Sequence, residues 1–249
     1  MRKFVLALAL SSPGLLLAAD TPQERMSDAT NVFTEIMATP DKGIPQDLLE
    51  KAHCIVIVPG MKQAAFGIGG KFGRGYAVCR EKGGGWGGPA AIRVEGGSFG
   101  FQIGASSTDV VMLLMNERGM RRLLEDKVTL GGEATVAAGP VGRTTSANTD
   151  AQLSAEILSW SRAKGLFAGI ALQGATLRPD NDVDQELYGA KLTNKEILTE
   201  HQTVPDSALP LIHALDKYSY REAKDTPLEK RAVDAASGDA DRSKTKKKQ

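Results

Sequence analysis

The sequence predicts an α+β fold in which a strongly curved antiparallel sheet, or a partial β-barrel, is flanked by short helices. The first observation is glycine density, because 20 of the 27 glycines lie between Gly60 and Gly142. Glycine inside a helix costs about 1 kcal/mol relative to alanine, so long helices are disfavoured there. The second observation is that short β-branched runs, such as 54–58 and 75–80, alternate with the glycines. Short connections of this kind favour antiparallel pairing and curvature.

The segment before the first strand predicts two helices, at 21–38 and 45–52. Thr21 and Pro22 suit the cap and the first turn of the longer one. Its apolar residues recur at helical spacing and are Met26, Ala29, Val32, Phe33, Ile36 and Met37. Since the polar face of this helix is mainly acidic, we expect its apolar face to dock on the domain rather than on a membrane.

The remaining elements follow from runs of apolar residues between turn signals. Further strands are predicted at 90–94, 98–104, 109–115, 128–130, 133–138 and 165–174. Further helices are predicted at 117–124, 181–188, 194–198 and 208–220, with Asn116 and Asp206 as caps. The segment 155–162 fits a helix and a strand equally well.

Composition divides the chain into three parts. Residues 1–19 combine an early pair of basic residues with an apolar run and a small-residue junction, which is typical of a signal peptide. Residues 20–224 are predicted to form a single domain, and residues 225–249 a disordered charged tail. This organisation predicts an exported protein, periplasmic or extracellular, that is soluble or peripherally attached to a membrane.

Charge is almost balanced over the whole chain, with a net charge of +1, but it is not balanced locally. Residues 20–51 hold three Lys or Arg and seven Asp or Glu, a net charge of −4. Residues 52–178 hold 14 Lys or Arg and nine Asp or Glu, a net charge of +5. Such a basic centre attracts anionic lipid or another polyanion. A solvated polar surface is the alternative that charge alone leaves open.

The two cysteines, Cys54 and Cys79, both lie in predicted strands. They are a candidate disulfide if the two strands bring them opposite each other. Two buried thiols that act as small apolar groups are the other interpretation.

Signals for catalysis are weak. The run Gly96–Gly100 matches G-x-S-x-G around Ser98, but the following residues alternate like a strand, whereas that motif requires a turn into a helix. The three histidines are too scattered for a metal cluster. We therefore expect no enzyme, no metal, no cofactor and no nucleic-acid partner.

Four blocks of sequence carry a resemblance to a known family. They are MKQAAFGIGGKFGRGYAVCR (61–80), GGSFGFQIGASSTDVVMLLMN (96–116), VTLGGEATVAAGPVGR (128–143) and WSRAKGLFAGIALQGATLRPD (160–180). In this order they resemble the SYLF lipid-binding family, over about residues 52–188. The resemblance implies a lipid-binding domain without enzymatic activity. Some members are associated with actin, but the predicted export leads us to expect no actin binding here and leaves the protein partner unknown.

The leading hypothesis is that a basic, glycine-rich face of the curved sheet binds the headgroup of an anionic phospholipid at the cell envelope. The predicted headgroup ligands lie in or beside the family blocks and are Lys62, Lys71, Arg74, Arg143, Arg162 and Lys164. Two alternatives remain: an envelope protein that serves a structural or partner-binding role without lipid, and a serine hydrolase that uses Ser98.

Overall fold

A computed structural model of the protein describes residues 20–39, 43–140, 155–163, 166–169 and 172–219. The predicted signal peptide, the predicted charged tail and two predicted ligands, Arg143 and Lys164, lie outside these residues.

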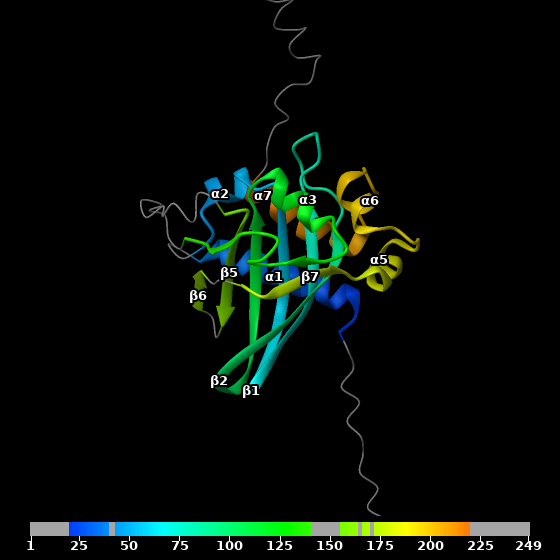
Figure 1. Cartoon of the computed structure of the whole chain (residues 1–249). Helices are drawn as coiled ribbons and strands as arrows, with labels where there is room; N and C mark the ends of the chain where they lie inside the picture. The colour runs from blue at the N-terminus through cyan, green and yellow to red at the C-terminus, as the bar shows by residue number, and fades with distance from the viewer. Residues whose placement is uncertain (1–19, 40–42, 141–154, 164–165, 170–171, 220–249) are drawn as a thin grey trace, which may run out of the picture.

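One curled sheet with helices around it makes up the described part (Figure 1). The strands are β1 (Cys54–Cys79), β2 (Ala90–Leu114), β3 (Val128–Thr129), β4 (Val136–Ala138), β5 (Ile157–Ala163), β6 (Leu166–Gly169) and β7 (Ala175–Pro179). The helices are α1 (Pro22–Ala38), α2 (Gln46–Lys51), α3 (Glu117–Leu123), α5 (Asn181–Tyr188), α6 (Asn194–Thr199), the 3₁₀ turn η1 (Asp206–Ala208) and α7 (Leu209–Ser219). The predicted α+β class with a strongly curved sheet is confirmed. The named strands pair in antiparallel fashion except β4 and β5, which run parallel.

Two very long strands organise the sheet. β1 and β2 pair in antiparallel register from Cys54 opposite Leu114 to Ala77 opposite Ala90, and this ribbon extends beyond the body of the protein (Figure 1). Near residues 66–68 of β1 the register shifts, and the ribbon folds back on itself. The early part of β2 then pairs with β7, and its late part pairs with β5. Because the two halves of the ribbon pair with different strands, β7 and β5, the sheet curls into a half-barrel.

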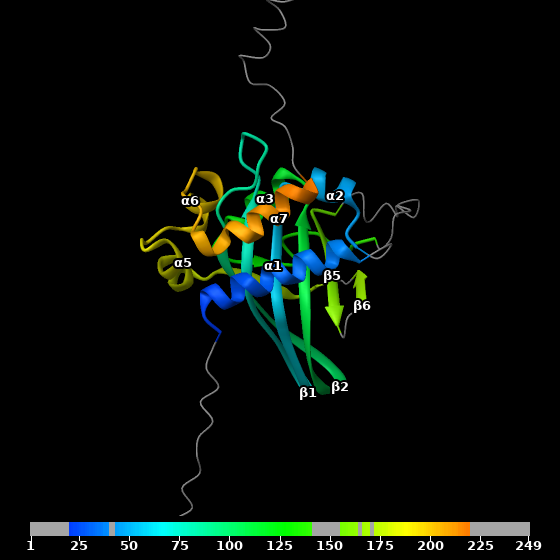
Figure 2. The ribbon, with the colours of Figure 1, turned by 180° about the vertical axis from the view of Figure 1, so that it is seen from behind.

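The outer face of the curl is covered by helices. Figure 2 shows α1 and α7 lying side by side across it, and the rings of Phe33 and Tyr218 meet edge to face with centroids 5.9 Å apart. The buried residues of α1 are Pro22, Arg25, Met26, Ala29, Val32, Phe33 and Ile36, which include five of the six predicted apolar positions. The predicted docking face of this helix is therefore confirmed.

Strand alternation supplies the two cores of the protein. Ile55 and Ile57 belong to the outer core beneath the helices, whereas Val56 and Val58 belong to the inner core enclosed by the curl. Nearly every residue at the start of β1 is thus buried, as the short apolar run predicts.

The predicted helix starts are largely present. The Thr21 hydroxyl accepts a hydrogen bond from the N–H of Glu24, whose carboxylate accepts one from the N–H of Thr21. Asn116 accepts from the N–H of Gly119 at the start of α3. Asp206 begins a 3₁₀ turn before α7 instead of capping that helix directly.

Candidate functional site

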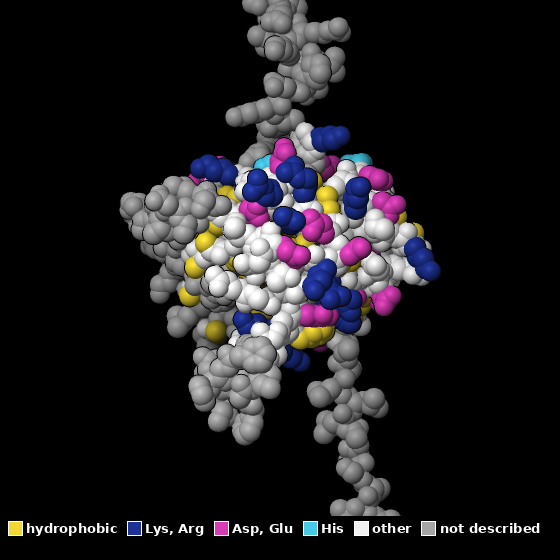
Figure 3. All heavy atoms as spheres, viewed as in Figure 1, with side chains coloured by type: hydrophobic (Ala, Val, Ile, Leu, Met, Phe, Trp, Pro, Cys, Tyr) yellow, Lys and Arg dark blue, Asp and Glu magenta, His cyan; other side chains and the backbone are white. Residues whose placement is uncertain are grey.

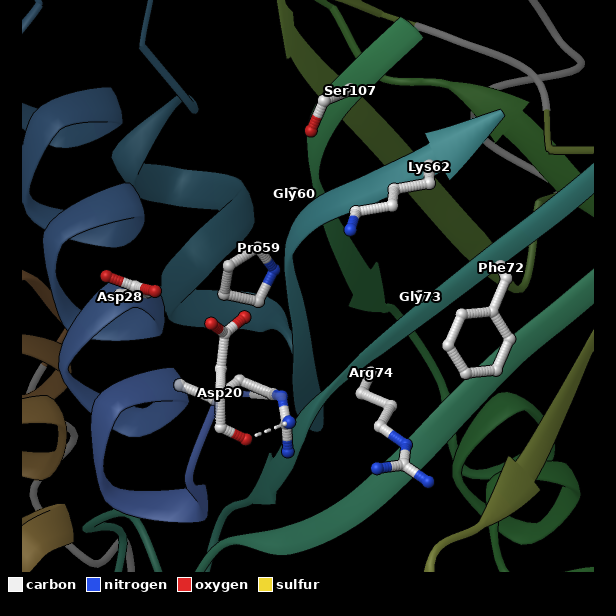
Figure 4. Close-up of a pocket in the computed structure, with 10 residues that line it drawn as sticks. Asp20, Asp28, Pro59, Gly60, Lys62, Phe72, Gly73, Arg74 and Ser107 are labelled. Atoms are coloured by element: carbon white, nitrogen blue, oxygen red, sulfur yellow. Dashed lines mark hydrogen bonds between the residues drawn. The ribbon is translucent and has the colours of Figure 1, made fainter. Parts of the chain in front are cut away.

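A cleft of about 370 Å³ lies between the start of α1 and the outer face of β1 (Figure 4). Its lining residues are Asp20, Arg25, Asp28, Pro59, Gly60, Lys62, Phe72, Gly73, Arg74 and Ser107. The cleft therefore joins the beginning of the described chain to both halves of β1.

Alternation along the strands decides which side chains reach the cleft. Tyr76 packs in the outer core, so Arg74 and Phe72, two and four residues earlier, share its face. Lys62 belongs to the other half of β1, follows the inner-core residue Met61, and therefore also lies on the outer face. Two predicted ligands, Lys62 and Arg74, are brought together in this way.

A bulge and a glycine make room for this convergence. The register shifts between Val58 and Met61, where Gly60 has a φ of 54°, a conformation that glycine adopts without strain. A Cβ on Gly73 would lie 2.6 Å from a methyl group of Val58. Glycine at this position allows the two halves of β1 to pass close to each other beneath the cleft.

Two arginines of the cleft are held by neighbours. The Arg74 Nε lies 3.1 Å from Oδ2 of Asp180, and the Arg74 side chain remains 39% exposed. The Arg25 side chain is almost buried and donates to the backbone carbonyl of Asp20 at 2.8 Å. The hydroxyl of Tyr76 donates to the carbonyl of Pro22 at 2.7 Å, and burial raises its pKa to about 12.

A row of arginines continues from the cleft across three neighbouring strands. Arg74 of β1 pairs in register with Arg93 of β2, which pairs with Arg178 of β7. Directly opposite side chains in a sheet lie close together, so these like charges repel unless acids offset them. Asp180 offsets Arg74, and Glu95 lies 3.7 Å from the Nε of Arg178. Within the described residues no ion pair of Arg93 is found.

Asp184 lies buried beside this region and accepts a hydrogen bond from the N–H of Ala91 at 2.7 Å. Burial raises the pKa of its carboxyl from 3.8 to about 7, and the Asp180 carboxylate acts in the same direction. The folded state therefore binds this proton more tightly than the unfolded chain does. The stability of the folded state therefore falls as the pH rises from 3.8, the pKa of this carboxyl in the unfolded chain, toward about 7, its pKa in the folded protein.

The variant Asp184→Asn removes this ionisation cost. We expect its free energy of unfolding to exceed that of the wild type by about 2 kcal/mol at about pH 8, and by half of that or less at about pH 5. Urea unfolding at the two pH values measures the difference. An equal effect at both values would contradict the titration of Asp184.

The remaining predicted ligands do not line the cleft. Lys71 precedes Phe72 and so lies on the opposite, inner face of β1. Arg162 of β5 is opposite Asp109 of β2, and its Nε donates a hydrogen bond of 2.8 Å to the Asp109 carboxylate. The Nη1 of Arg162 forms an ion pair with Glu35 of α1. The other oxygen of Asp109 accepts from the N–H of Gly60 at 2.8 Å. Arg162 thus helps to fix the bulge at the edge of the cleft.

The basic residue Arg80 has a packing role. Its guanidinium donates to the carbonyls of Leu49, Ala52 and Ser219 and lies 4.2 Å from the ring centroid of Trp86. These contacts tie the end of β1 to α2 and α7.

The structure joins Cys54 and Cys79 in a disulfide between the two ends of β1, with their Cα atoms 4.0 Å apart. The backbone N–H of Arg80 also donates to the carbonyl of His53 at 2.9 Å. The fold-back of β1 is therefore fastened at its base as well as crossed near Gly73.

A second cleft, of about 490 Å³, lies at the far end of β1 between the 80–87 turn and α6. His201 and Glu81 line it and form a contact of 2.8 Å between Nδ1 and Oε2. Among the described residues no group of three His, Cys, Asp or Glu is placed to bind a metal.

Ser98 lies in the interior of β2, paired with Gly69 of β1. The strand continues well beyond it, so the turn into a helix that a G-x-S-x-G nucleophile needs does not follow.

Sequence reasoning did not identify four residues of this region: Arg25, Phe72, Arg93 and Arg178. Arg25 was not considered as a ligand because the polar face of its helix is mainly acidic. Phe72 carries no charge and was not considered as a ligand, but its side chain is 47% exposed. Arg93 and Arg178 join Arg74 through strand register, which no spacing in the sequence reveals.

On the face seen in Figure 3, Lys and Arg side chains lie among Asp and Glu side chains. A basic surface of one sign does not extend over this face, so any attraction of anions there is local. Among the described residues, no helix has the length and apolar character needed to cross a bilayer.

Comparison with known proteins finds relatives in yeast and in animals. A family model, Ysc84, described as Las17-binding protein actin regulator, matches residues 95–218. Protein YSC84 of Saccharomyces cerevisiae is 34% identical over 183 residues, covering 72% of this chain and 39% of that protein. LAS seventeen-binding protein 3 of this yeast is 33% identical over 186 residues, covering 73% of this chain and 40% of that protein. The human SH3 domain-containing YSC84-like protein 1 is 33% identical over 190 residues, covering 75% and 55%. The chain thus spans about two fifths to just over half the length of these relatives.

Two predictions are wrong when set against these relatives. Actin-related binding was not expected, but the family description and the relatives' names refer to Las17 binding and actin regulation, which points to protein partners. Export was expected from the composition of residues 1–19, but these relatives are yeast and animal proteins, and the matching family is described as an actin regulator. The prediction rested on composition alone, because an apolar segment after basic residues is typical of a targeting signal, and residues 1–19 lie outside the described residues.

The names of the family and of its members are those of binding proteins and regulators rather than enzymes. The family model runs from β2 to α7, and the relatives are identical to the chain at about a third of the aligned positions, which cover about three quarters of the chain. The chain belongs to the Ysc84 family, the SYLF-domain proteins that its four sequence blocks resemble.

Proposed function

We propose that the chain is a non-enzymatic module that binds the headgroup of an anionic phospholipid in the cleft between α1 and β1. The observation that carries this proposal is the convergence of Lys62 and Arg74 from the two halves of β1 beside the exposed ring of Phe72.

The three side chains suit a phosphate at a membrane surface. Within the described residues the Lys62 ammonium has no ion pair, and the Arg74 side chain remains partly exposed while its Nε contacts Asp180. Lys and Arg both bind phosphate oxygens strongly. An exposed aromatic ring beside them suits the boundary between headgroups and acyl chains. Gly60 in the lining is only partly buried and carries no side chain, which leaves its backbone accessible to the ligand.

Arg93 and Arg178 support the same proposal at longer range. They continue the row that begins at Arg74, and the three arginines of this row outnumber the two acids that contact it, Asp180 and Glu95. Each basic residue near an anionic membrane surface contributes about 1 kcal/mol to attraction.

The double variant Lys62→Ala/Arg74→Ala is expected to weaken association with anionic vesicles about 10-fold to 30-fold, because two contributions of about 1 kcal/mol are lost. Flotation with vesicles of neutral or anionic phospholipid, at low and high salt, measures this. The wild type should float with anionic vesicles only, and less so at high salt.

The matched control is Lys127→Ala/Lys191→Ala, which removes two exposed lysines outside the cleft. It should float like the wild type. Equal loss in both double variants would mean that general charge, not the cleft, attracts the vesicles. Absence of flotation in every mixture would contradict lipid binding altogether.

A second candidate function is the binding of a protein partner. It is favoured by the family description, which refers to Las17 binding and actin regulation, and by the name of a relative, which refers to Las17 binding. Absence of vesicle binding, together with saturable binding to purified Las17 or actin, would favour this candidate over the lipid site.

A further inference from the structure

The two walls of the cleft carry opposite charges. Figure 4 shows Asp20 and Asp28 on the side of α1, and Lys62, Phe72 and Arg74 on the side of β1. Both aspartates are exposed. A ligand in the cleft therefore faces acids on one side and bases on the other.

The carboxylates of the acidic wall are available to a ligand. Within the described residues neither Asp20 nor Asp28 has an ion pair or a hydrogen bond to its carboxylate. Arg25, the cation between them in sequence, donates to the backbone carbonyl of Asp20 rather than to its side chain. The two negative charges of this wall are thus only partly offset by Arg25.

A headgroup that offers only a phosphate would leave these carboxylates facing another anion. Like charges brought together in a partly desolvated site repel, and uncompensated polar groups cost free energy. A headgroup with a nearby ammonium group avoids both effects, since its N–H groups donate to the carboxylates while its phosphate contacts Lys62 and Arg74.

We propose that the cleft selects headgroups in which a primary ammonium lies two carbons from the phosphate, the phosphoethanolamine unit common to phosphatidylethanolamine and phosphatidylserine. This inference rests on the proposed phosphate site at Lys62 and Arg74. Phosphatidylcholine lacks the N–H donors, and phosphatidylglycerol lacks the positive charge. The cleft volume of about 370 Å³ lies within the range of small-ligand sites.

The first test compares two lipids of equal net charge. Vesicles of phosphatidylcholine containing phosphatidylserine should bind the protein about fivefold more tightly than vesicles with the same fraction of phosphatidylglycerol, as expected for two exposed charge contacts. Replacing part of the phosphatidylcholine by phosphatidylethanolamine should also strengthen binding. Soluble phosphoethanolamine should compete better than glycerol phosphate, which identifies the free headgroup as sufficient.

The second test exchanges the acidic wall. Asp20→Asn/Asp28→Asn should abolish the advantage of phosphatidylserine and increase binding to phosphatidylglycerol. The control, Asp182→Asn/Glu186→Gln, makes the same charge change at two exposed positions on α5 and should retain the advantage. Thermal unfolding of both variants verifies that they fold.

The outcomes separate this inference from the proposed function. If the wild type bound phosphatidylserine and phosphatidylglycerol equally and Lys62→Ala/Arg74→Ala bound neither, the selectivity would be overturned. The proposed phosphate site would still be supported. Loss of the advantage in both acidic variants would assign it to overall charge and overturn the role of the wall. Absence of binding to either lipid would overturn both.

Discussion

Replacing Gly75 by alanine is expected to lower the free energy of unfolding by about 3 kcal/mol or more, because no space exists for a methyl group there. A Cβ on Gly75 would lie 2.0 Å from the carbonyl oxygen of Ile57 and 2.8 Å from the Cα of Val58. Both atoms belong to the backbone of the opposing half of β1, so no side chain can rotate away. Denaturant unfolding of the two proteins measures the loss.

The matched control is another strand glycine. A Cβ on Gly97 of β2 meets nothing within 4 Å, so Gly97→Ala should leave stability unchanged or raise it by a few tenths of a kcal/mol. If Gly75→Ala proved as stable as Gly97→Ala, the two halves of β1 would not cross as closely as described.

Loss of the Cys54–Cys79 bridge is expected to lower the free energy of unfolding by about 3 kcal/mol. The bridge joins residues 25 apart, and a loop of this length loses roughly that much chain entropy in the unfolded state when it is closed. Cys54→Ala/Cys79→Ala, compared with the oxidised protein in urea, measures the difference.

A reducing agent gives an independent control for this second prediction. It should destabilise the wild type by a similar amount and leave the double variant unaffected. Equal urea midpoints for oxidised and reduced wild type would show that the bridge adds nothing to stability.

Local patterns in the sequence predicted the parts of the fold that depend on neighbours in the chain. The apolar face of α1, the cap at Thr21 and the strand at 54–58 follow from spacing and residue type alone. Glycine was harder to interpret. The sequence predicts separate short strands at 54–58 and 75–80, with Gly75 at the start of the second. Gly73 and Gly75 instead lie inside the continuous strand β1, where the absence of a side chain permits a close crossing.

The site depends on contacts between distant residues, and the sequence predicted less of it. Lys62 and Arg74 were chosen for their charge and their place in family blocks, whereas their shared face depends on the bulge at Gly60. That bulge changes the alternation between the two residues. Arg162 was chosen on the same grounds, but strand register places it opposite Asp109.

The fold-back of β1 also has a consequence for the order in which the protein folds. The paired residues Ala77 and Ala90 are only 13 positions apart in the sequence, whereas the paired residues Cys54 and Leu114 are 60 positions apart. Closing a short loop is faster than closing a long one, so the half of the ribbon that contains Arg74 is expected to form first. The half that contains Lys62 closes last. The cleft is therefore completed by the slowest pairing in the ribbon, and a ligand bound there stabilises only the fully assembled chain.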